Sequence, residues 1–217
     1  DTAVVKCTKV IQNHAMPSAE GSKEAEFNPW IDENWLTIGK AFFYRGDYEK
    51  ALKNFQFTKR FFAKDPSKYI AELWIAKIYI QQNRITEAKT LLDELQNTAL
   101  EQEKKEQSSK FSKKKKTSKL DDDYVPEMDR RTQFEMYKTK ASLYLIKQQA
   151  EEVLFPLSQA VSRCNNKRER ARLNFILGQM YLATNGLDSA RISFKKSISP
   201  SADYDISFNG KRNYAVL

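Results

Sequence analysis

The chain has 217 residues, of which 41% are hydrophobic and 30% are charged, an ordinary balance for a globular protein. Six Gly, six Pro and two Cys exclude a collagen-like chain, a turn-rich barrel and a disulfide scaffold. No apolar run approaches the roughly 18 to 20 residues that cross a bilayer, which excludes a membrane-spanning protein. The one histidine, His14, has no partner motif, and most zinc and histidine-base chemistry is excluded with it.

The net charge of +9 is concentrated in one segment. Residues 104–119 hold eight Lys and one Glu, a net of +7, which leaves +2 for the other 201 residues. A nucleic-acid-binding domain spreads its basic residues over a folded face, so this nearly neutral remainder argues against a nucleic-acid partner. The Ser/Lys-rich composition predicts a disordered insertion at about 101–126 that begins as the extension of a helix. A solvated loop is the leading interpretation of this tract, a contact for an acidic protein or anionic headgroups is the second, and nucleic acid is the third.

The chain begins with a predicted helix at 2–14, whose apolar stripe contains Val4, Val5 and either Val10 or Ile11. A polar loop from Met16 to Phe27 follows, and Asn28-Pro29 has the pattern of an N-cap with Pro at the first helical position. Because the sequence starts at Asp1 without Met, we expect a processed protein or a piece of a longer one.

Four later segments, 34–56, 73–95, 138–160 and 175–197, superimpose on one another. The intervals between their equivalent residues are 37, 65 and 37, so one insertion, containing the lysine tract, interrupts a regular repeat. Three positions recur: a small residue, an aromatic three residues later, and a second small or short apolar residue. These are Gly39, Ala76, Ala141 and Gly178, then Phe42, Tyr79, Tyr144 and Tyr181, then Ala51, Ala88, Val153 and Ala190.

Each repeat unit is predicted to be a pair of antiparallel helices that approach closely at the small residues. Gly46 and the Asn185-Gly186 pair mark turns, since they permit the left-handed conformation that stops a helix. Pro66 and Pro200 are expected to close second helices, and Pro156 to kink one. The predicted units are about 32–66, 69–100, 134–165 and 171–200, with 203–216 as the first helix of a fifth, all in a single domain over 1–217.

The first unit, W-x2-I-G-x2-F…A-x3-F…P, resembles the tetratricopeptide repeat, although the third unit departs from the pattern at Ala150 and Pro156. The resemblance implies an all-α solenoid whose first helices line a concave, partner-binding surface. Lys40, Lys77, Lys138 and Arg172 would form a basic stripe suited to an extended or acidic peptide, while some groove positions would pack against neighbouring helices instead. Carried onto this sequence, the groove residues are Leu36, Lys40, Phe43, Tyr44, Leu73, Lys77, Ile80, Lys138, Ser142, Leu145, Arg172, Phe175 and Gln179.

No constellation in the sequence indicates catalysis. The Asp121–Asp123 run lacks the ligand spacing and turn Gly of a calcium loop and is interpreted as charge compensation for the lysine tract. Cys7 and Cys164 are 157 residues apart, so they form no ligand-spaced pair. There is no nucleophile elbow, phosphate loop or paired-carboxylate motif. The sequence predicts a non-enzymatic protein with no metal and no cofactor.

A narrower resemblance covers most of the chain. The runs CTKVIQNHAM, NPWIDENWLTIGKAFFYRGDYEKALKNFQFTKRFFAKDP and FKKSISPSADYDISFNGKRNYA are similar to the repeat region of PorW/SprE-type lipoproteins, with the Lys-rich insertion as the chief departure. That family implies a Bacteroidota protein anchored to the outer membrane in the periplasm, a component of the type IX secretion and gliding motility machinery. Its partners would be secretion-machine or translocon subunits.

The same resemblance implies that membrane association comes only from a lipid anchor outside these residues, which are themselves expected to be soluble. The alternative is a cytosolic tetratricopeptide adaptor that binds chaperone or client peptides in its groove.

Overall fold

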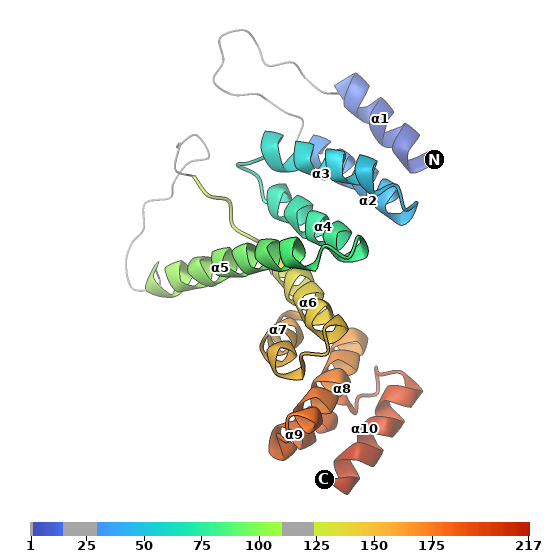
Figure 1. Ribbon diagram of the computed structural model, residues 1–217, viewed down its shortest axis with the longest axis vertical. Helices are drawn as coiled ribbons and strands as arrows, with labels where there is room; N and C mark the ends of the chain where they lie inside the picture. The colour runs from blue at the N-terminus through green and yellow to red at the C-terminus, as the bar shows by residue number, and fades with distance from the viewer. Residues whose placement is uncertain (1, 15–29, 110–123) are drawn as a thin grey trace. The chain divides into compact units, whose positions relative to one another are not determined.

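A computed structural model describes residues 2–14, 30–109 and 124–217, and every regular element in these ranges is a helix (Figure 1). The all-α fold class is therefore confirmed, and so are the helices expected at 2–14 and 203–216. The helices are α1 (Thr2–His14), α2 (Ile31–Tyr44), α3 (Tyr48–Phe61), α4 (Ser67–Gln81), α5 (Ile85–Ser109), α6 (Arg130–Ile146), α7 (Ala150–Arg163), α8 (Lys167–Ala183), α9 (Leu187–Ser197) and α10 (Tyr204–Val216).

The chain divides into two compact units, Asp1–Met128 with α1 to α5 and Asp129–Leu217 with α6 to α10. In the first unit α2 pairs with α3 and α4 with α5, while α1 packs on α2 and α3 packs on α4. In the second unit α6 pairs with α7 and α8 with α9, and α10 packs on both α8 and α9. Each unit is thus a stack of helix hairpins. The expectation of one domain over 1–217 stays a prediction.

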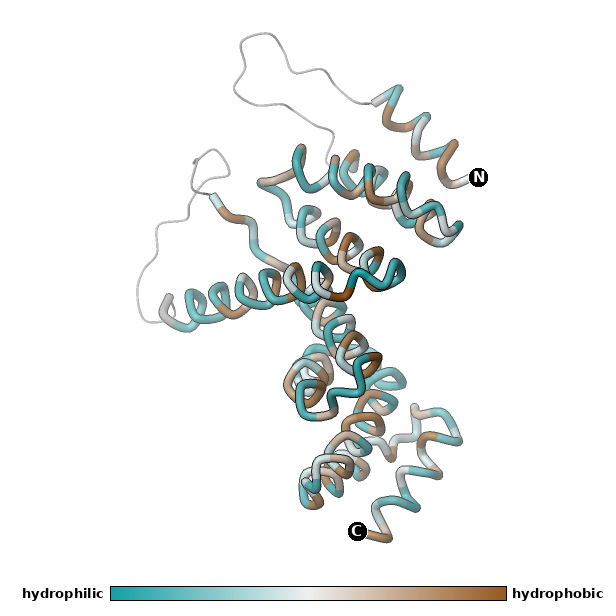
Figure 2. Tube along the Cα trace, in the orientation of Figure 1, coloured by the Kyte–Doolittle hydropathy of each residue, from teal (hydrophilic) through white to brown (hydrophobic). Residues whose placement is uncertain are grey.

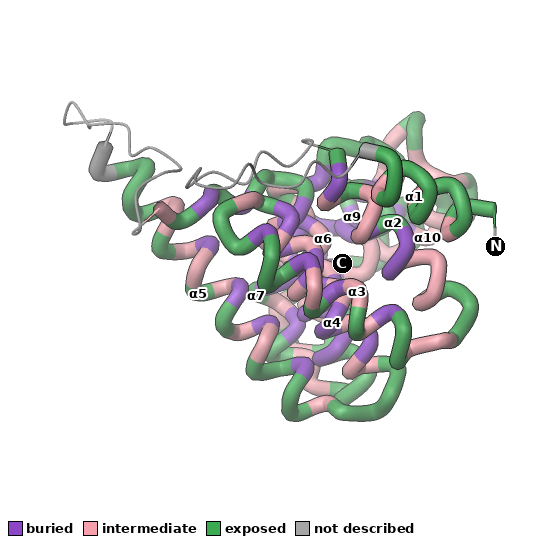
Figure 3. The backbone as a smooth tube through the Cα atoms, turned by 90° about the horizontal axis from the view of Figure 1, so that it is seen from above, coloured by how far each residue is buried: buried purple, intermediate pink, exposed green. Residues whose placement is uncertain are grey.

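The helices pack apolar residues against their neighbours. Figure 2 shows hydrophobic and hydrophilic residues alternating along the helices, and Figure 3 shows buried positions alternating with exposed ones. In the first unit the core gathers Leu36, Ala51, Phe55, Ile75 and Ile78 from α2, α3 and α4. Among the described residues, no helix is both long and apolar enough to cross a bilayer.

All four hairpin turns use the same backbone motif. One residue in each turn has a left-handed conformation: Gly46 (φ 79°), Asn83 (59°), Gln148 (57°) and Asn185 (58°). The N–H of the next residue donates to the carbonyl of the repeat's aromatic residue at 2.8–3.0 Å, as Asp47 does to Phe42. This is the Schellman arrangement, which satisfies carbonyls left over at a helix end. The prediction for Gly46 is confirmed; in the last turn Asn185, not Gly186, takes the left-handed conformation.

The small repeat residues allow close helix contacts, as predicted. A Cβ added to Gly39 would lie 2.6 Å from the Phe55 ring, and one added to Gly178 would lie 2.8 Å from Phe194. Both phenylalanines are fully buried, 16 residues after their glycines. The same two positions in the other hairpins hold the buried pairs Ala76 with Leu92 and Ala141 with Leu157. A smaller residue on one helix therefore matches a larger one on its partner.

Several expected boundaries differ from the structure. Helix α2 begins at Ile31, while Asn28, Pro29 and the Met16–Phe27 loop lie outside the described residues. Pro66 caps the start of α4 instead of closing α3, which ends at Phe61. Helix α7 is continuous through Pro156, and the expected kink stays a prediction.

The insertion begins as predicted, because α5 continues to Ser109. Residues 110–123, and with them the predicted disorder and the Asp121–Asp123 run, lie outside the described residues.

Beyond the insertion, the chain returns to the first unit at a polar clasp. The Tyr69 hydroxyl and the Gln102 side-chain amide each donate to the Pro126 carbonyl at 2.9 Å. The Met128 N–H donates to Gln102 Oε1 at 2.8 Å. Burial raises the pKa of the Tyr69 hydroxyl, which keeps it a donor. The clasp joins α4, α5 and the segment that leads to the second unit.

Candidate functional site

The first helices of the first two hairpins bring a group of aromatic and basic side chains together. Lys40, Phe43 and Tyr44 follow each other at helical spacing on α2, and Trp74 and Lys77 do so on α4. Since α2 packs against α4, these side chains meet on one side of the first unit. We call these five residues the α2–α4 surface.

Trp74 is the centre of this surface. Its inner face stacks on buried Phe55, with ring centroids 5.8 Å apart and planes 15° apart. Phe43 and Tyr44 meet it edge-on, at centroid distances of 5.1 and 5.8 Å. Tyr44 is 77% exposed, so the cluster presents an aromatic ring to solvent on a rigid base. Aromatic rings held in this way are common anchors of protein interfaces.

Two lysines flank the same indole ring. Lys77 Nζ lies 4.5 Å and Lys40 Nζ 5.8 Å from the Trp74 ring centroid, within the range of a cation–π contact. Both residues are partly buried, and their ammonium groups lie beside the aromatic cluster. The arrangement combines positive charge with an apolar base.

Sequence reasoning identified Lys40 and Lys77 but missed Trp74. A signal was available, because Trp74 precedes Lys77 by three residues and so lies on the same side of α4. Its role depends, however, on the packing of α2 against α4, which brings Lys40 and Phe43 to it.

Two of the predicted groove residues do not line an open surface. Leu36 and Leu73 are each only 2% exposed. Leu36 belongs to the core with Ala51 and Phe55, because its side of α2 faces the neighbouring helices. The expectation that these leucines are accessible to a partner is wrong. Ile80, farther along α4, is partly buried.

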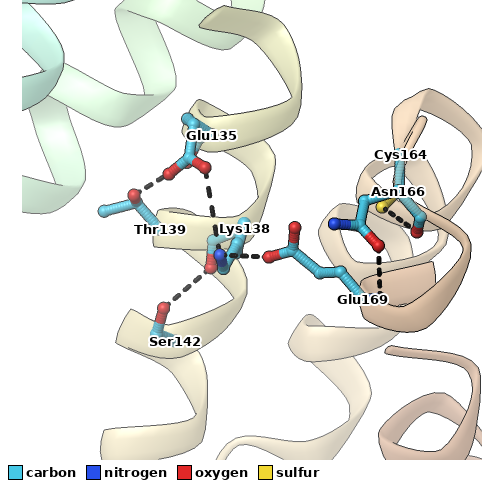
Figure 4. A network of polar contacts seen from close by, with 7 residues as sticks. All are labelled: Glu135, Lys138, Thr139, Ser142, Cys164, Asn166 and Glu169. Carbon is cyan, nitrogen blue, oxygen red and sulfur yellow. Dashed lines mark hydrogen bonds and ion pairs between the residues drawn. The ribbon is translucent and has the colours of Figure 1, made fainter. Parts of the chain in front are cut away.

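In the second unit, Lys138 forms ion pairs with two carboxylates. Its ammonium lies 2.5 Å from Glu169 on α8 and 3.9 Å from Glu135 on its own helix, α6 (Figure 4). Burial acts to lower the pKa of Lys138, but the hydrogen bond to Glu169 and the two negative charges outweigh it and raise that pKa. Lys138 joins α6 to α8 and adds no net charge to the surface, so the predicted basic stripe is wrong at this position.

The other predicted residues of the second unit lie on α6 and α8. Leu145 is 37% exposed, and the Ser142 hydroxyl donates to the Lys138 carbonyl at 2.7 Å. Arg172 and Gln179 are exposed on α8. Phe175 is partly buried and meets Phe194 edge-on, with centroids 5.6 Å apart.

Neither cysteine is set up as a nucleophile. Cys164 is buried and Cys7 partly buried, and burial raises the pKa of both thiols, which disfavours the reactive thiolate. Within the parts of the chain that the structure describes, no group of three or more His, Cys, Asp or Glu side chains is placed to hold a metal ion.

The helix hairpins agree with a family comparison. Residues 42–104, which include α3, α4 and most of α5, match the family model described as tetratricopeptide repeat. This supports the repeat prediction. A search of curated proteins finds no match to the chain.

Solved structures similar to the chain include two proteins at low identity. One is a MamA RS-1 ArsTM double mutant, with a TM-score of 0.49 and 14% identity, covering 98% of this chain and 96% of that one. The other is TTC0263, a thermophilic TPR protein of Thermus thermophilus, with a TM-score of 0.35 and 15% identity, covering 86% of this chain and 100% of that one. Because both TM-scores lie below 0.5, the fold assignment rests on the helix hairpins and the family match.

Proposed function

We propose that this protein is a non-enzymatic interaction scaffold whose α2–α4 surface binds a segment of a partner protein. The observation that carries the proposal is the pair of lysine ammonium groups held within 5.8 Å of one Trp74 ring centroid, next to exposed Tyr44. The tetratricopeptide repeat match over residues 42–104 supports it, because stacked helix hairpins present extended surfaces to other proteins.

The chemistry of the surface defines the segment that it fits. Tyr44 and Trp74 offer apolar area to an aromatic or aliphatic side chain, and Lys40 and Lys77 offer positive charge to a carboxylate beside it. The aromatic groups would supply most of the affinity, since buried aromatic anchors dominate interface energies. The lysines would determine orientation and the rate of association.

The resemblance to PorW/SprE-type lipoproteins extends the proposal to a cellular role. On that basis the partners are subunits of the type IX secretion and gliding machinery or of its translocon. The scaffold then works in the periplasm, in a protein anchored to the outer membrane by a lipid outside these residues. A cytosolic adaptor for chaperone or client peptides is the competing role.

The test is a pull-down from native cell envelopes with the 217-residue chain as bait, followed by mass spectrometry and by direct titration of each recovered subunit. A Lys40→Glu/Lys77→Glu bait reverses both charges at the α2–α4 surface. Lys53→Glu/Lys89→Glu, at exposed lysines of α3 and α5, is the matched control. Circular dichroism checks that all baits keep their helicity.

We expect secretion-machine or translocon subunits to bind the native and control chains and to be lost with Lys40→Glu/Lys77→Glu. If they bind all three baits equally, the scaffold role stands and the α2–α4 surface is the wrong site. Recovery of soluble chaperones or clients alone contradicts the envelope role and supports the cytosolic adaptor.

A further inference from the structure

Outside the lysine tract, the second unit has a net positive charge and the first unit a net negative one. Residues 129–217, all of which the structure describes, contain fifteen Lys and Arg against eight Asp and Glu, a net of +7. In the first unit, the residues outside 104–119 contain fourteen basic and nineteen acidic groups, a net of −5. The near-neutral remainder inferred from the sequence is thus the sum of two opposite charges, and the second unit is strongly basic.

At least five of the eight carboxylates in this unit already have local partners, and one of them is Glu152, which accepts from the Gln149 side-chain amide. Asp203 accepts from the Arg168 guanidinium, and Glu135 and Glu169 pair with Lys138. Asp129 accepts from the Thr132 N–H at the start of α6. Arg172 on α8 and Arg212 on α10 are among the exposed cations of this unit.

An aromatic pair is exposed on α10. Tyr204 and Phe208, one helical turn apart, are 79% and 54% exposed, and their rings stack with centroids 6.0 Å apart and planes 17° apart. The opposite side of α10 is fixed, because buried Gly210 lies so close to Ser197 of α9 that a Cβ would collide with its hydroxyl. The pair therefore faces solvent from a well-anchored helix.

Basic groups lie at both ends of this pair. At one end, Arg168 is hydrogen-bonded to Asp203, the residue before Tyr204. That bond, with the charge of nearby Arg172 adding to it, lowers the pKa of Asp203. At the other end, Arg212 follows Phe208 by four residues and so continues the same side of α10. We call Arg172, Tyr204, Phe208 and Arg212 the α8–α10 surface.

We propose that the α8–α10 surface is a second docking site, which binds an acidic protein segment with an aromatic or large aliphatic residue between its carboxylates. The stacked rings seat the apolar side chain, and the cations at the two ends take the carboxylates. The eight-residue step along the helix from Tyr204 to Arg212 spans about 12 Å at roughly 1.5 Å per residue. An extended segment covers that length in about four residues. This site is independent of the α2–α4 surface.

The arrangement favours a protein segment over a nucleic acid. A single-stranded nucleic acid needs a continuous row of cations along its phosphates and open ring faces for its bases. Here Tyr204 and Phe208 stack on each other, and the cations lie at the ends of the pair.

The test is fluorescence anisotropy with the full 217-residue chain and a labelled EDFLDE peptide. The comparison peptide, EDSSDE, has the same charge and no apolar residue. The test variants are Tyr204→Ser/Phe208→Ser, Arg172→Glu/Arg212→Glu and the milder Arg172→Gln/Arg212→Gln. The matched control, Ile192→Ser/Lys195→Glu, changes an exposed apolar residue and an exposed cation on α9. Lys40→Glu/Lys77→Glu changes only the α2–α4 surface.

We expect EDFLDE to bind about tenfold more tightly than EDSSDE, and the aromatic and Glu variants each to weaken its binding about tenfold, a moderate loss for interface residues. The Gln variant should weaken it less, and the α9 control and Lys40→Glu/Lys77→Glu should leave it unchanged. The proposal is overturned if EDFLDE does not bind, if both peptides bind alike, or if the test variants bind like the native chain. It is also overturned if unlabelled hexathymidylate competes as well as EDFLDE, since the surface would then recognise any polyanion. A loss with Lys40→Glu/Lys77→Glu would assign the peptide to the first unit and also overturn it.

Discussion

Gln148 shows how strongly the repeat imposes its geometry on a single residue. It has a φ of 57°, the conformation that Gly46, Asn83 and Asn185 take in the equivalent turns. Glycine takes this conformation without steric cost and asparagine with little, whereas other side chains crowd the backbone. The bond from the Gln149 N–H to the Tyr144 carbonyl, at 3.0 Å, requires the turn all the same. The surrounding hairpin therefore holds Gln148 in an unfavourable conformation.

Replacing Gln148 by Gly should stabilise the protein. The strain released is about 1–2 kcal/mol, and the extra flexibility of Gly in the unfolded chain costs about 0.5–1 kcal/mol, so a net gain of up to about 1.5 kcal/mol is expected. Urea denaturation followed by circular dichroism measures it. Lys147→Gly is the control. Lys147 has a φ of −79°, so this change relieves no strain and should destabilise the protein. A loss in both variants would contradict the assigned strain.

At the scale of the elements, the hairpins are matched by volume. The first and last pair a glycine with a phenylalanine, and the middle two have an alanine and a leucine at the same positions. Each combination fills a similar space between the two helices. Volume matching explains why the small residue is Gly in two hairpins and Ala in the other two. Its position is nevertheless kept, at an interval of 37 residues within each pair of units.

The double variant Gly39→Ala/Phe55→Leu tests this matching. Gly39→Ala alone should destabilise the protein by about 1–3 kcal/mol, because the new Cβ overpacks against the Phe55 ring. Phe55→Leu alone should destabilise it by leaving a cavity. Together they recreate the Ala–Leu pair of the second hairpin, so the double variant should be more stable than the sum of the two losses. Additive losses in urea denaturation would show that the two positions are not coupled.

At the scale of the whole molecule, the clasp fixes the end of the long connection between α5 and α6. Gln102 accepts from the Met128 N–H and donates to the Pro126 carbonyl, so one side chain holds the returning segment at two points. Tyr69 adds a third bond from α4. The sequence predicted the insertion from its spacing and composition, but these contacts join residues 24 to 57 positions apart and follow from no local pattern.

Replacing Gln102 by Leu should cost more stability than replacing Tyr69 by Phe. The first change leaves the Met128 N–H without its acceptor and should cost about 1–3 kcal/mol, whereas Tyr69→Phe leaves Pro126 its bond from Gln102 and should cost about 1 kcal/mol. Hydrogen exchange at the Met128 amide should accelerate in Gln102→Leu and change little in Tyr69→Phe. Equal exchange in both variants would contradict the assigned role of Gln102.

The charge of the molecule also becomes clear only at this scale. Summed over the sequence, everything outside residues 104–119 is close to neutral, which argued against a nucleic-acid partner. The chain divides into two compact units with different charge. Residues 129–217 have a net charge of +7, whereas the first unit outside residues 104–119 has a net charge of −5. The boundary follows from packing, and a composition count cannot supply it.

The sequence by itself determined the helical hairpins, the turns at Gly46 and Asn185 and the close contacts between helices, because these depend on residue spacing and on local properties of Gly, Asn and small side chains. It also singled out Lys40, Lys77 and Tyr44, which the structure brings together around Trp74 in the α2–α4 surface. Only the tertiary structure decided that Leu36 and Leu73 are buried, that Lys138 is paired with Glu169, and that Trp74 lies between the two lysines. Those outcomes depend on which side of each helix meets a neighbour and which distant side chains the packing brings within a few ångströms, and no single helix encodes either.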